Sequence, residues 1–197
     1  NDDFGRLSPL RRVPVYRDPA ITLCDSTVIC EYLQDSRPDG HPLYPPDARA
    51  RAEARWLEEY ADTRLGEVFI WRLFNERAIR RAVWGEASDP AIIERTLEVD
   101  VPEVLEQLEA RMPASGFLFG VIGVADIAIA AMFRNAALVR FEIDAARWPR
   151  TARLVSEALA HPAFASLRPF EDLIARTPIA AQRAVLQAAG APLTQVS

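Results

Sequence analysis

Two short runs of apolar and β-branched residues, 13–16 and 21–24, stand near the start of the chain. Four residues separate the runs, and this spacing is typical of an antiparallel hairpin. Residues 27–34 then carry apolar side chains at helical spacing, which predicts a helix that begins at Asp25 and Ser26. This part of the chain therefore predicts a small α+β unit.

The chain then changes from a mixed to a helical pattern. Residues 36–47 are rich in Pro, Gly and Asp, which predicts a linker. Residues 48–82 predict one long helix with two apolar stripes. The first stripe consists of Leu57, Ala61, Leu65 and Val68, and the second of Trp56, Tyr60, Ile70 and Phe74. A helix that is apolar on two sides must bury both, against its own bundle and against another domain or subunit.

Further helices are predicted over residues 90–112, 123–140, 149–160 and 163–175, and Pro102 is expected to disturb the first of these. The helix over 123–140 is apolar almost all round, so we expect it at the centre of the bundle. The remainder of the chain has only a weak helical pattern.

These elements divide the 197 residues into three parts. We expect an α+β domain over residues 1–35, a linker over 36–47 and an all-helical bundle over 48–197. Hydrophobic residues make up 50% of the chain and charged residues 26%, a composition that excludes a disordered protein.

Charge and apolar runs restrict the partners of the protein. The 23 basic and 28 acidic residues are well mixed, and the absence of a basic run argues against nucleic acid. The longest apolar stretch, 121–133, is shorter than the ~20 residues that a membrane span needs, and it contains Asp126. Cys24 and Cys30 predict no disulfide framework. With no signal peptide recognised, we expect the protein in the cytoplasm and away from membranes.

The most informative segment is SPLRRVPVYRDPAITLCDSTVICEYL, residues 8–33. It contains Val13-Pro14 in the first predicted strand and Asp25-Ser26 at the start of the helix. This combination resembles the glutathione-binding half of the thioredoxin-like domain of cytosolic glutathione transferases.

The later segments extend the resemblance over nearly the whole chain. Leu43-Tyr44-Pro45 is similar to the motif that precedes the helical domain of the family, and FLFGVIGVADIAIA, WPR and HPAF resemble parts of that domain. The resemblance implies the glutathione transferase fold, with a partial thioredoxin-like domain followed by the all-α domain.

The resemblance also implies a glutathione-binding site. Val13 precedes a proline, Pro14, that is cis in the family, and its backbone would bind the cysteinyl part strand to strand. Ser26 would bind the α-carboxylate of the γ-glutamyl part at the helix N-terminus, and Asp25 would face the α-ammonium. Taken singly, these features also fit an ordinary edge-strand proline and a helix cap.

Arg12 is expected to approach the glycyl carboxylate of glutathione. Arg11 stands where the family commonly has Gly, so which of the two arginines reaches the ligand stays open, and both also fit a solvated turn. Cys24 lies next to the helix start, but we interpret it as a small buried residue and not as a nucleophile.

The catalytic residue cannot be assigned. In the family, a Tyr, Ser or Cys near the glutathione sulfur belongs to a β-α-β unit that precedes the segment around Phe4, and we expect the complete protein to carry that unit. Trp56, Tyr60 and Arg64 are weak candidates for the electrophile pocket, and a role in the core or in a dimer interface fits them equally well.

Two features are interpreted as structural. His41 and His161 have no neighbours at a metal-binding spacing, so we predict no metal site. Gly123 and Asp126 correspond to the capping box of the family's central helix, with Gly in place of the usual Ser or Thr.

The function implied by the resemblance is conjugation of the glutathione thiolate to hydrophobic electrophiles, with glutathione as a substrate and a symmetric homodimer as the assembly. Two alternatives stay open. One is a glutathione-dependent isomerase or dehalogenase on the same fold, and the other is a non-catalytic binding or regulatory protein.

Overall fold

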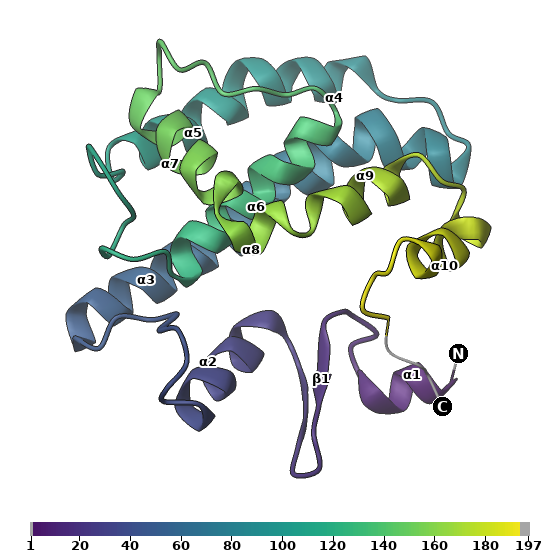
Figure 1. Ribbon diagram of the computed structural model, residues 1–197. Helices are drawn as coiled ribbons and strands as arrows, with labels where there is room; N and C mark the ends of the chain where they lie inside the picture. Colours follow the sequence, from purple (N-terminus) through teal and green to yellow (C-terminus); the bar gives the residue numbers. More distant parts are fainter. Residues whose placement is uncertain (1, 194–197) are drawn as a thin grey trace.

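The computed structural model describes residues 2–193. The N-terminal part consists of α1 (Asp2–Leu7), β1 (Val15–Arg17), β2 (Thr22–Cys24) and α2 (Ser26–Ser36). The two strands form the predicted antiparallel hairpin, which is confirmed. Figure 1 shows these elements together on one side of the helices that follow. The short helix α1 has no counterpart among the predictions.

The rest of the described chain is helical. Its elements are α3 (Ala48–Tyr60), η1 (Ala61–Trp84), α4 (Pro90–Arg95), η2 (Thr96–Asp100), α5 (Val101–Glu109), α6 (Val124–Leu138), α7 (Pro149–Ala160), α8 (Pro162–Ala165), α9 (Arg168–Ala175) and α10 (Ile179–Ala188). No helix within residues 2–193 combines the length and the apolar content that crossing a membrane would require.

The long helix predicted over residues 48–82 is confirmed. Its α-helical part, α3, passes into the π-helical part, η1, without a break, because Tyr60 and Ala61 both keep right-handed helical backbone. It ends at Gly85, whose φ of 68° is the left-handed conformation that terminates many helices.

The two apolar stripes of this long helix are buried to different extents. The stripe with Leu57 and Leu65 is buried in the core. The other stripe is only partly covered, and the side chain of Trp56 is 48% exposed. The described residues thus bury this second stripe only in part.

Pro102 disturbs the second long helix as expected. A proline has no N–H to donate to the preceding turn. The wide turns of η2 end at Asp100, two residues before Pro102, and the N–H of Val101 donates to the carbonyl of Thr96, five residues back. The helix is therefore continuous but locally widened between α4 and α5.

One prediction for the C-terminal region is wrong. The single helix expected over 163–175 is divided, since α8 ends at Ala165 and α9 begins at Arg168. Pro169 lies in the first turn of α9, where its missing N–H is tolerated, and it favours a new helix start. The weakly patterned segment that follows forms a full helix, α10.

The core is built around α6, as its apolar sequence predicts. This helix packs against η1, α7 and α3. The ring centroids of Phe133 on α6 and Phe69 on η1 are 4.7 Å apart, and those of Phe69 and Phe141 are 5.2 Å apart. The aromatic contacts fix the centre of the bundle.

The start of α6 is bound to the linker. Asp126 is fully buried, and its carboxylate accepts hydrogen bonds from the N–H groups of Gly123 and Leu118, each at 3.0 Å. The N–H of Val124 donates to the carbonyl of Leu43 at 2.9 Å. A Cβ at Gly123 would lie only 2.8 Å from that carbonyl oxygen. The linker carbonyl therefore occupies the position in which a Ser or Thr side chain would be expected, and this explains the glycine.

We expect Gly123→Ser to destabilise the protein, although serine is a favoured helix cap. The new Cβ would force the linker away from α6, at a cost of about 1–3 kcal/mol in the free energy of unfolding. Gly66→Ala is the control, because a Cβ there meets its nearest atom at 3.6 Å, an ordinary contact. Urea unfolding of both variants tests this, and a Gly123→Ser protein as stable as wild type would contradict it.

Candidate functional site

The hairpin register brings the two predicted ligand-binding motifs to the same end of the sheet. Val15 on β1 lies opposite Cys24 on β2. Val13 lies two residues before this pair in the chain, and Ser26 lies two residues after it, at the start of α2. The segment before β1 and the start of α2 therefore both begin at the open end of the hairpin.

Val13 presents backbone groups that no described residue uses. Its peptide bond to Pro14 is cis, and its side chain is 80% exposed. Its N–H and C=O have no hydrogen-bond partner within residues 2–193. The loop before it is fixed by Ser8, whose buried hydroxyl donates to the carbonyl of Arg12 and accepts from its N–H. An extended peptide at this edge would find a free donor and a free acceptor.

The N-terminus of α2 combines a helix cap with free donors. Asp25 is the N-cap, and its carboxylate accepts from the N–H of Val28 at 3.2 Å. Its φ of 110° is uncommon outside glycine, costs about 1–3 kcal/mol and is a kind of strain that concentrates at functional sites. The N–H groups of Ser26 and Thr27 have no partner in the described part of the chain. Together with the helix dipole, they can bind an anion.

The two arginines of the loop point to different partners. Arg11 has a φ of 53°, a conformation that glycine adopts at no cost. Its guanidinium lies against α1, since a Cβ built on Gly5 would be 3.2 Å from its Nη2. Arg12 is exposed, and its side chain has no hydrogen-bond or ion-pair partner among the described residues. This geometry favours Arg12 as the arginine that is free to meet a ligand.

A buried carboxylate lies behind the start of α2. Glu58 on α3 is only 4% exposed. It accepts a hydrogen bond from the hydroxyl of Thr27 at 2.9 Å and another from the hydroxyl of Tyr44 at 2.9 Å. Glu58 is not among the site residues predicted from the sequence. Its signal was a charged residue next to Leu57, on the stripe of the helix that is otherwise apolar.

Burial shifts the titration of the acidic groups around this site. It raises the pKa of Glu58 above its ordinary value, although the two hydroxyl hydrogen bonds act in the opposite direction. Burial also raises the pKa of Asp62, and the nearby charges of Asp25 and Glu59 add to the rise. The start of α2 therefore has negative charge behind it, which favours a cationic group on the ligand side.

Neither cysteine has the properties of a nucleophile. Both are free, as predicted. The thiol of Cys24 donates to the carbonyl of Leu7 at 2.8 Å, which ties the hairpin to α1. Burial, followed by the charge of Glu58, raises the pKa of the Cys30 thiol, so it stays protonated at neutral pH.

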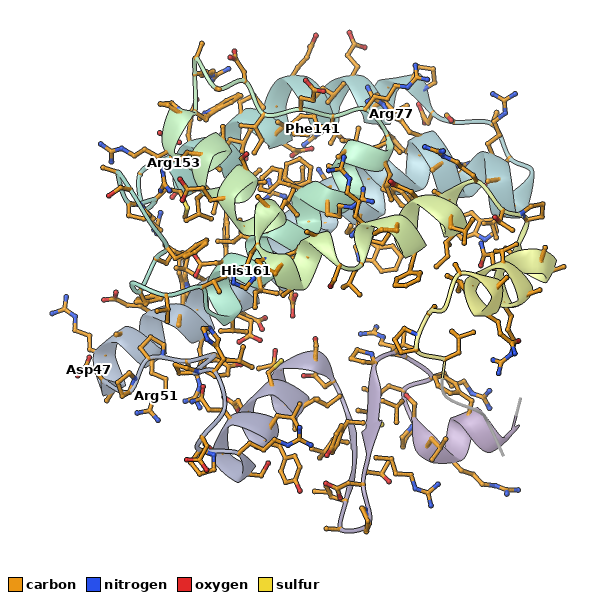
Figure 2. All side chains as sticks on the ribbon, viewed as in Figure 1. Asp47, Arg51, Arg77, Phe141, Arg153 and His161 are labelled. Carbon is orange, nitrogen blue, oxygen red and sulfur yellow. The ribbon has the colours of Figure 1, made fainter. Side chains whose placement is uncertain are left out.

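The two histidines have structural partners. His41 Nε2 lies 2.8 Å from the carbonyl of Ile122, where it joins the linker to the segment before α6. His161 caps α8 by accepting from the N–H of Ala163, and Figure 2 shows it at the junction of α7 and α8. Within the part of the chain that the structure describes, no group of three or more His, Cys, Asp and Glu side chains is suited to a metal ion.

Trp56, Tyr60 and Arg64 lie on the side of the long helix that faces α5. The rings of Trp56 and Tyr60 stack with their centroids 5.5 Å apart. The guanidinium carbon of Arg111 lies over the Trp56 ring, 4.8 Å from its centroid. Arg64 pairs with three acidic groups, of which the nearest is Glu67 at 2.9 Å. These contacts correspond to the alternative interpretation of the three residues as parts of the packing.

A mostly apolar cavity lies away from these three residues, between the end of η1, α6, α9 and α10. Its volume is about 780 Å³, within the usual range for small-molecule sites. Its lining includes Phe74, Ala78, Ala131, Phe164, Ile174 and Ile179. The only lining cation among the described residues is Arg134, whose guanidinium is bound by Glu171 at 2.6 Å and Asp172 at 3.2 Å. None of Trp56, Tyr60 and Arg64 belongs to this lining.

The fold and the N-terminal site can now be compared with known proteins. The chain has the glutathione transferase fold, with a small sheet followed by a mostly helical part, as the sequence predicts. Residues 1–41 match the sequence family described as "Glutathione S-transferase, N-terminal domain". The resemblance to cytosolic glutathione transferases is thereby confirmed.

Two individual proteins are similar to this chain in sequence. Protein LigF of Sphingobium sp. is 32% identical over 128 residues, which cover 59% of this chain and 45% of LigF. Mouse glutathione S-transferase theta-1 is 33% identical over 118 residues, which cover 54% of this chain and 45% of the mouse protein. The matched part thus spans about half the length of these relatives.

A solved structure extends the similarity over most of the chain. Maleylacetoacetate isomerase from Methylobacterium extorquens AM1 superposes with a TM-score of 0.65 at 26% identity, over 90% of this chain and 80% of the isomerase. That structure holds malonate and glutathione.

We expect the stability of the protein to fall as the pH rises through the titration of Glu58. A carboxyl whose pKa is raised by folding stabilises the folded state fully below its ordinary value of 4.5, and this contribution is lost as the pH rises through the raised value. Glu58→Gln removes that slope, so the variant gains stability relative to wild type between pH 4.5 and neutrality.

Urea unfolding of both proteins across this pH range provides the measurement. Glu53→Gln, on the exposed face of the same helix, is the control and should parallel wild type. Parallel pH profiles for wild type and Glu58→Gln would contradict the expectation.

Proposed function

We propose that the protein binds glutathione at the open end of the hairpin and transfers its thiolate to a hydrophobic electrophile. The observation that carries the proposal is that Val13 and Ser26 flank the open end of the hairpin. Free backbone groups on one side and a helix N-terminus on the other suit a short anionic peptide. The solved isomerase with bound glutathione supports the same ligand.

Each part of glutathione has a proposed partner. The backbone of Val13, before the cis Pro14, binds the cysteinyl part. Ser26 binds the γ-glutamyl carboxylate with its hydroxyl and N–H, and Asp25 faces the γ-glutamyl ammonium. Arg12 binds the glycyl carboxylate, since Arg11 is engaged against α1.

The proposed chemistry is nucleophilic substitution or addition by sulfur. The thiol loses its proton to solvent, a carbon–sulfur bond forms, and in a substitution the bond to the leaving group breaks. Holding the thiolate beside the electrophile removes much of the entropic barrier of the bimolecular reaction. No residue of the chain is assigned to activation of the thiol.

We propose the cavity lined by Phe74, Ala131 and Phe164 as the electrophile pocket, in place of the region around Trp56, Tyr60 and Arg64. Its lining is mostly apolar, and its cation is already paired with two carboxylates. An uncharged, aromatic electrophile fits such a lining better than a dicarboxylate does.

Three further predictions accompany the proposal. The domain division at the linker, residues 36–47, and a cytoplasmic location follow from the sequence analysis. A symmetric homodimer is proposed because one stripe of the long helix, which includes Trp56, is only partly covered.

The first test is calorimetric titration of the protein with glutathione. We expect a dissociation constant between micromolar and millimolar, equivalent to about −8 to −4 kcal/mol. Ser26→Ala removes a hydrogen bond to a carboxylate and should weaken binding about tenfold or more. Ser36→Ala, at the opposite end of α2, is the matched control and should bind as wild type does. Absence of glutathione binding by wild type would reject the proposal.

A second test concerns the electrophile pocket. Ala131→Phe places a ring in the proposed pocket and should lower kcat/KM for 1-chloro-2,4-dinitrobenzene at least about tenfold, with glutathione affinity unchanged. Ala137→Phe is the control, because Ala137 is exposed on the same helix outside the lining. If Trp56→Ala lowers kcat/KM and Ala131→Phe does not, the pocket is wrongly assigned.

A further inference from the structure

Helix α2 contributes little apolar surface to the core. Its N-terminal end, at Ser26 and Thr27, is the ligand-binding end of the proposed glutathione site. Ile29 is its one buried residue within α2, and Val28 is 46% exposed. Apolar packing therefore leaves the orientation of α2 weakly determined, and polar links have to supply the rest. The ligand-binding end is the part for which orientation matters most.

The far end of α2 is held by the linker. The side-chain carbonyl of Gln34 accepts from the N–H of Leu43 at 2.8 Å and from the N–H of Tyr44 at 2.6 Å. In the middle of the helix, Glu31 pairs with Arg55 of α3 at 2.6 Å, but both side chains are solvent-accessible, and such pairs contribute little.

The ligand-binding end is held by Glu58. Thr27 directly follows Ser26, and its hydroxyl donates to Oε1 of Glu58 while Tyr44 donates to Oε2. The side chain of Thr27 is thereby turned toward α3, and its N–H stays free with that of Ser26. One buried carboxylate thus joins the first turn of α2, the linker and the long helix.

From this geometry, and resting on the proposed function, we propose that Glu58 is a positioning residue for the glutathione site. Through Thr27 it sets the first turn of α2, so that the N–H and hydroxyl of Ser26 face the γ-glutamyl carboxylate. Glu58 itself does not touch the ligand.

The energetic cost of Glu58 agrees with this role. Burial raises its pKa, which means that the ionised form is less stable inside the protein than in water. No described cation lies within salt-bridge distance of Glu58. A buried carboxylate without a cation is a poor source of stability, and its value lies in fixing the geometry of its partners.

The test uses Thr27→Val, which removes the hydroxyl at nearly constant shape, and Thr27→Ser, which keeps it. We expect Thr27→Val and Glu58→Gln each to weaken glutathione binding about tenfold, since a hydrogen bond to a charged group is lost or weakened. Thr27→Ser should bind within about twofold of wild type. In the double variant the two effects should be much less than additive, because both act on one link.

Hydrogen exchange of the ligand-free proteins supplies a readout that does not depend on glutathione. Amides 28–30, the first hydrogen-bonded amides of α2, should exchange faster in Thr27→Val and Glu58→Gln than in wild type, with Thr27→Ser unchanged. Tyr44→Phe is the control that removes the other hydrogen bond of Glu58, and amides 28–30 should keep most of their protection in it.

The outcomes are decisive in each case. Unchanged glutathione affinity in Thr27→Val and Glu58→Gln overturns the inference, even if their thermal stability falls. If wild type binds no glutathione, the proposed function fails, and the inference is then decided by exchange alone. Unchanged exchange of amides 28–30 overturns it in that case.

Discussion

The contact between the linker and the N-terminus of α6 is the constraint on which the rest of the structure depends. Asp126 has no exposed surface, yet its two N–H partners and the carbonyl of Leu43 on Val124 satisfy the helix start. An unsatisfied helix end at the centre of the bundle would cost several hydrogen bonds. The backbone approach is possible only because Gly123 has no side chain. These contacts fix the linker to the bundle, and none of them involves the hairpin.

From that anchor the position of the candidate site follows by a short chain of polar contacts. Tyr44 adjoins the anchored Leu43, and its hydroxyl reaches Glu58, which in turn binds Thr27 at the start of α2. The ligand-binding end of α2 is thus connected to the centre of the bundle through hydrogen bonds rather than through apolar packing. Directional contacts fix an orientation with little buried area, which leaves the neighbouring backbone groups free for a ligand.

Much of the fold could be predicted because it rests on local patterns. The hairpin, the long helix and the apolar central helix all follow from spacing, and these predictions are confirmed. The division at Pro169 and the formation of α10 could not be predicted in this way. A proline fits both the interior of a weak pattern and a new first turn, and α10 is stabilised by packing against α9, which no local pattern contains.

The candidate site shows the same limit more sharply. The motif at Asp25 and Ser26 is visible in the sequence, but the free state of the N–H groups of Ser26 and Thr27 depends on where every neighbouring acceptor lies. Glu58 interrupts an apolar stripe, which marks it as unusual without naming its partners, since Thr27 lies 31 residues away. Sequence patterns identify residues that are costly for the fold, and only the three-dimensional contacts show what those residues hold in place. Here the costly residues, strained Asp25 and buried Glu58, lie on either side of the same helix turn, and that coincidence is the strongest physical reason to regard the turn as functional.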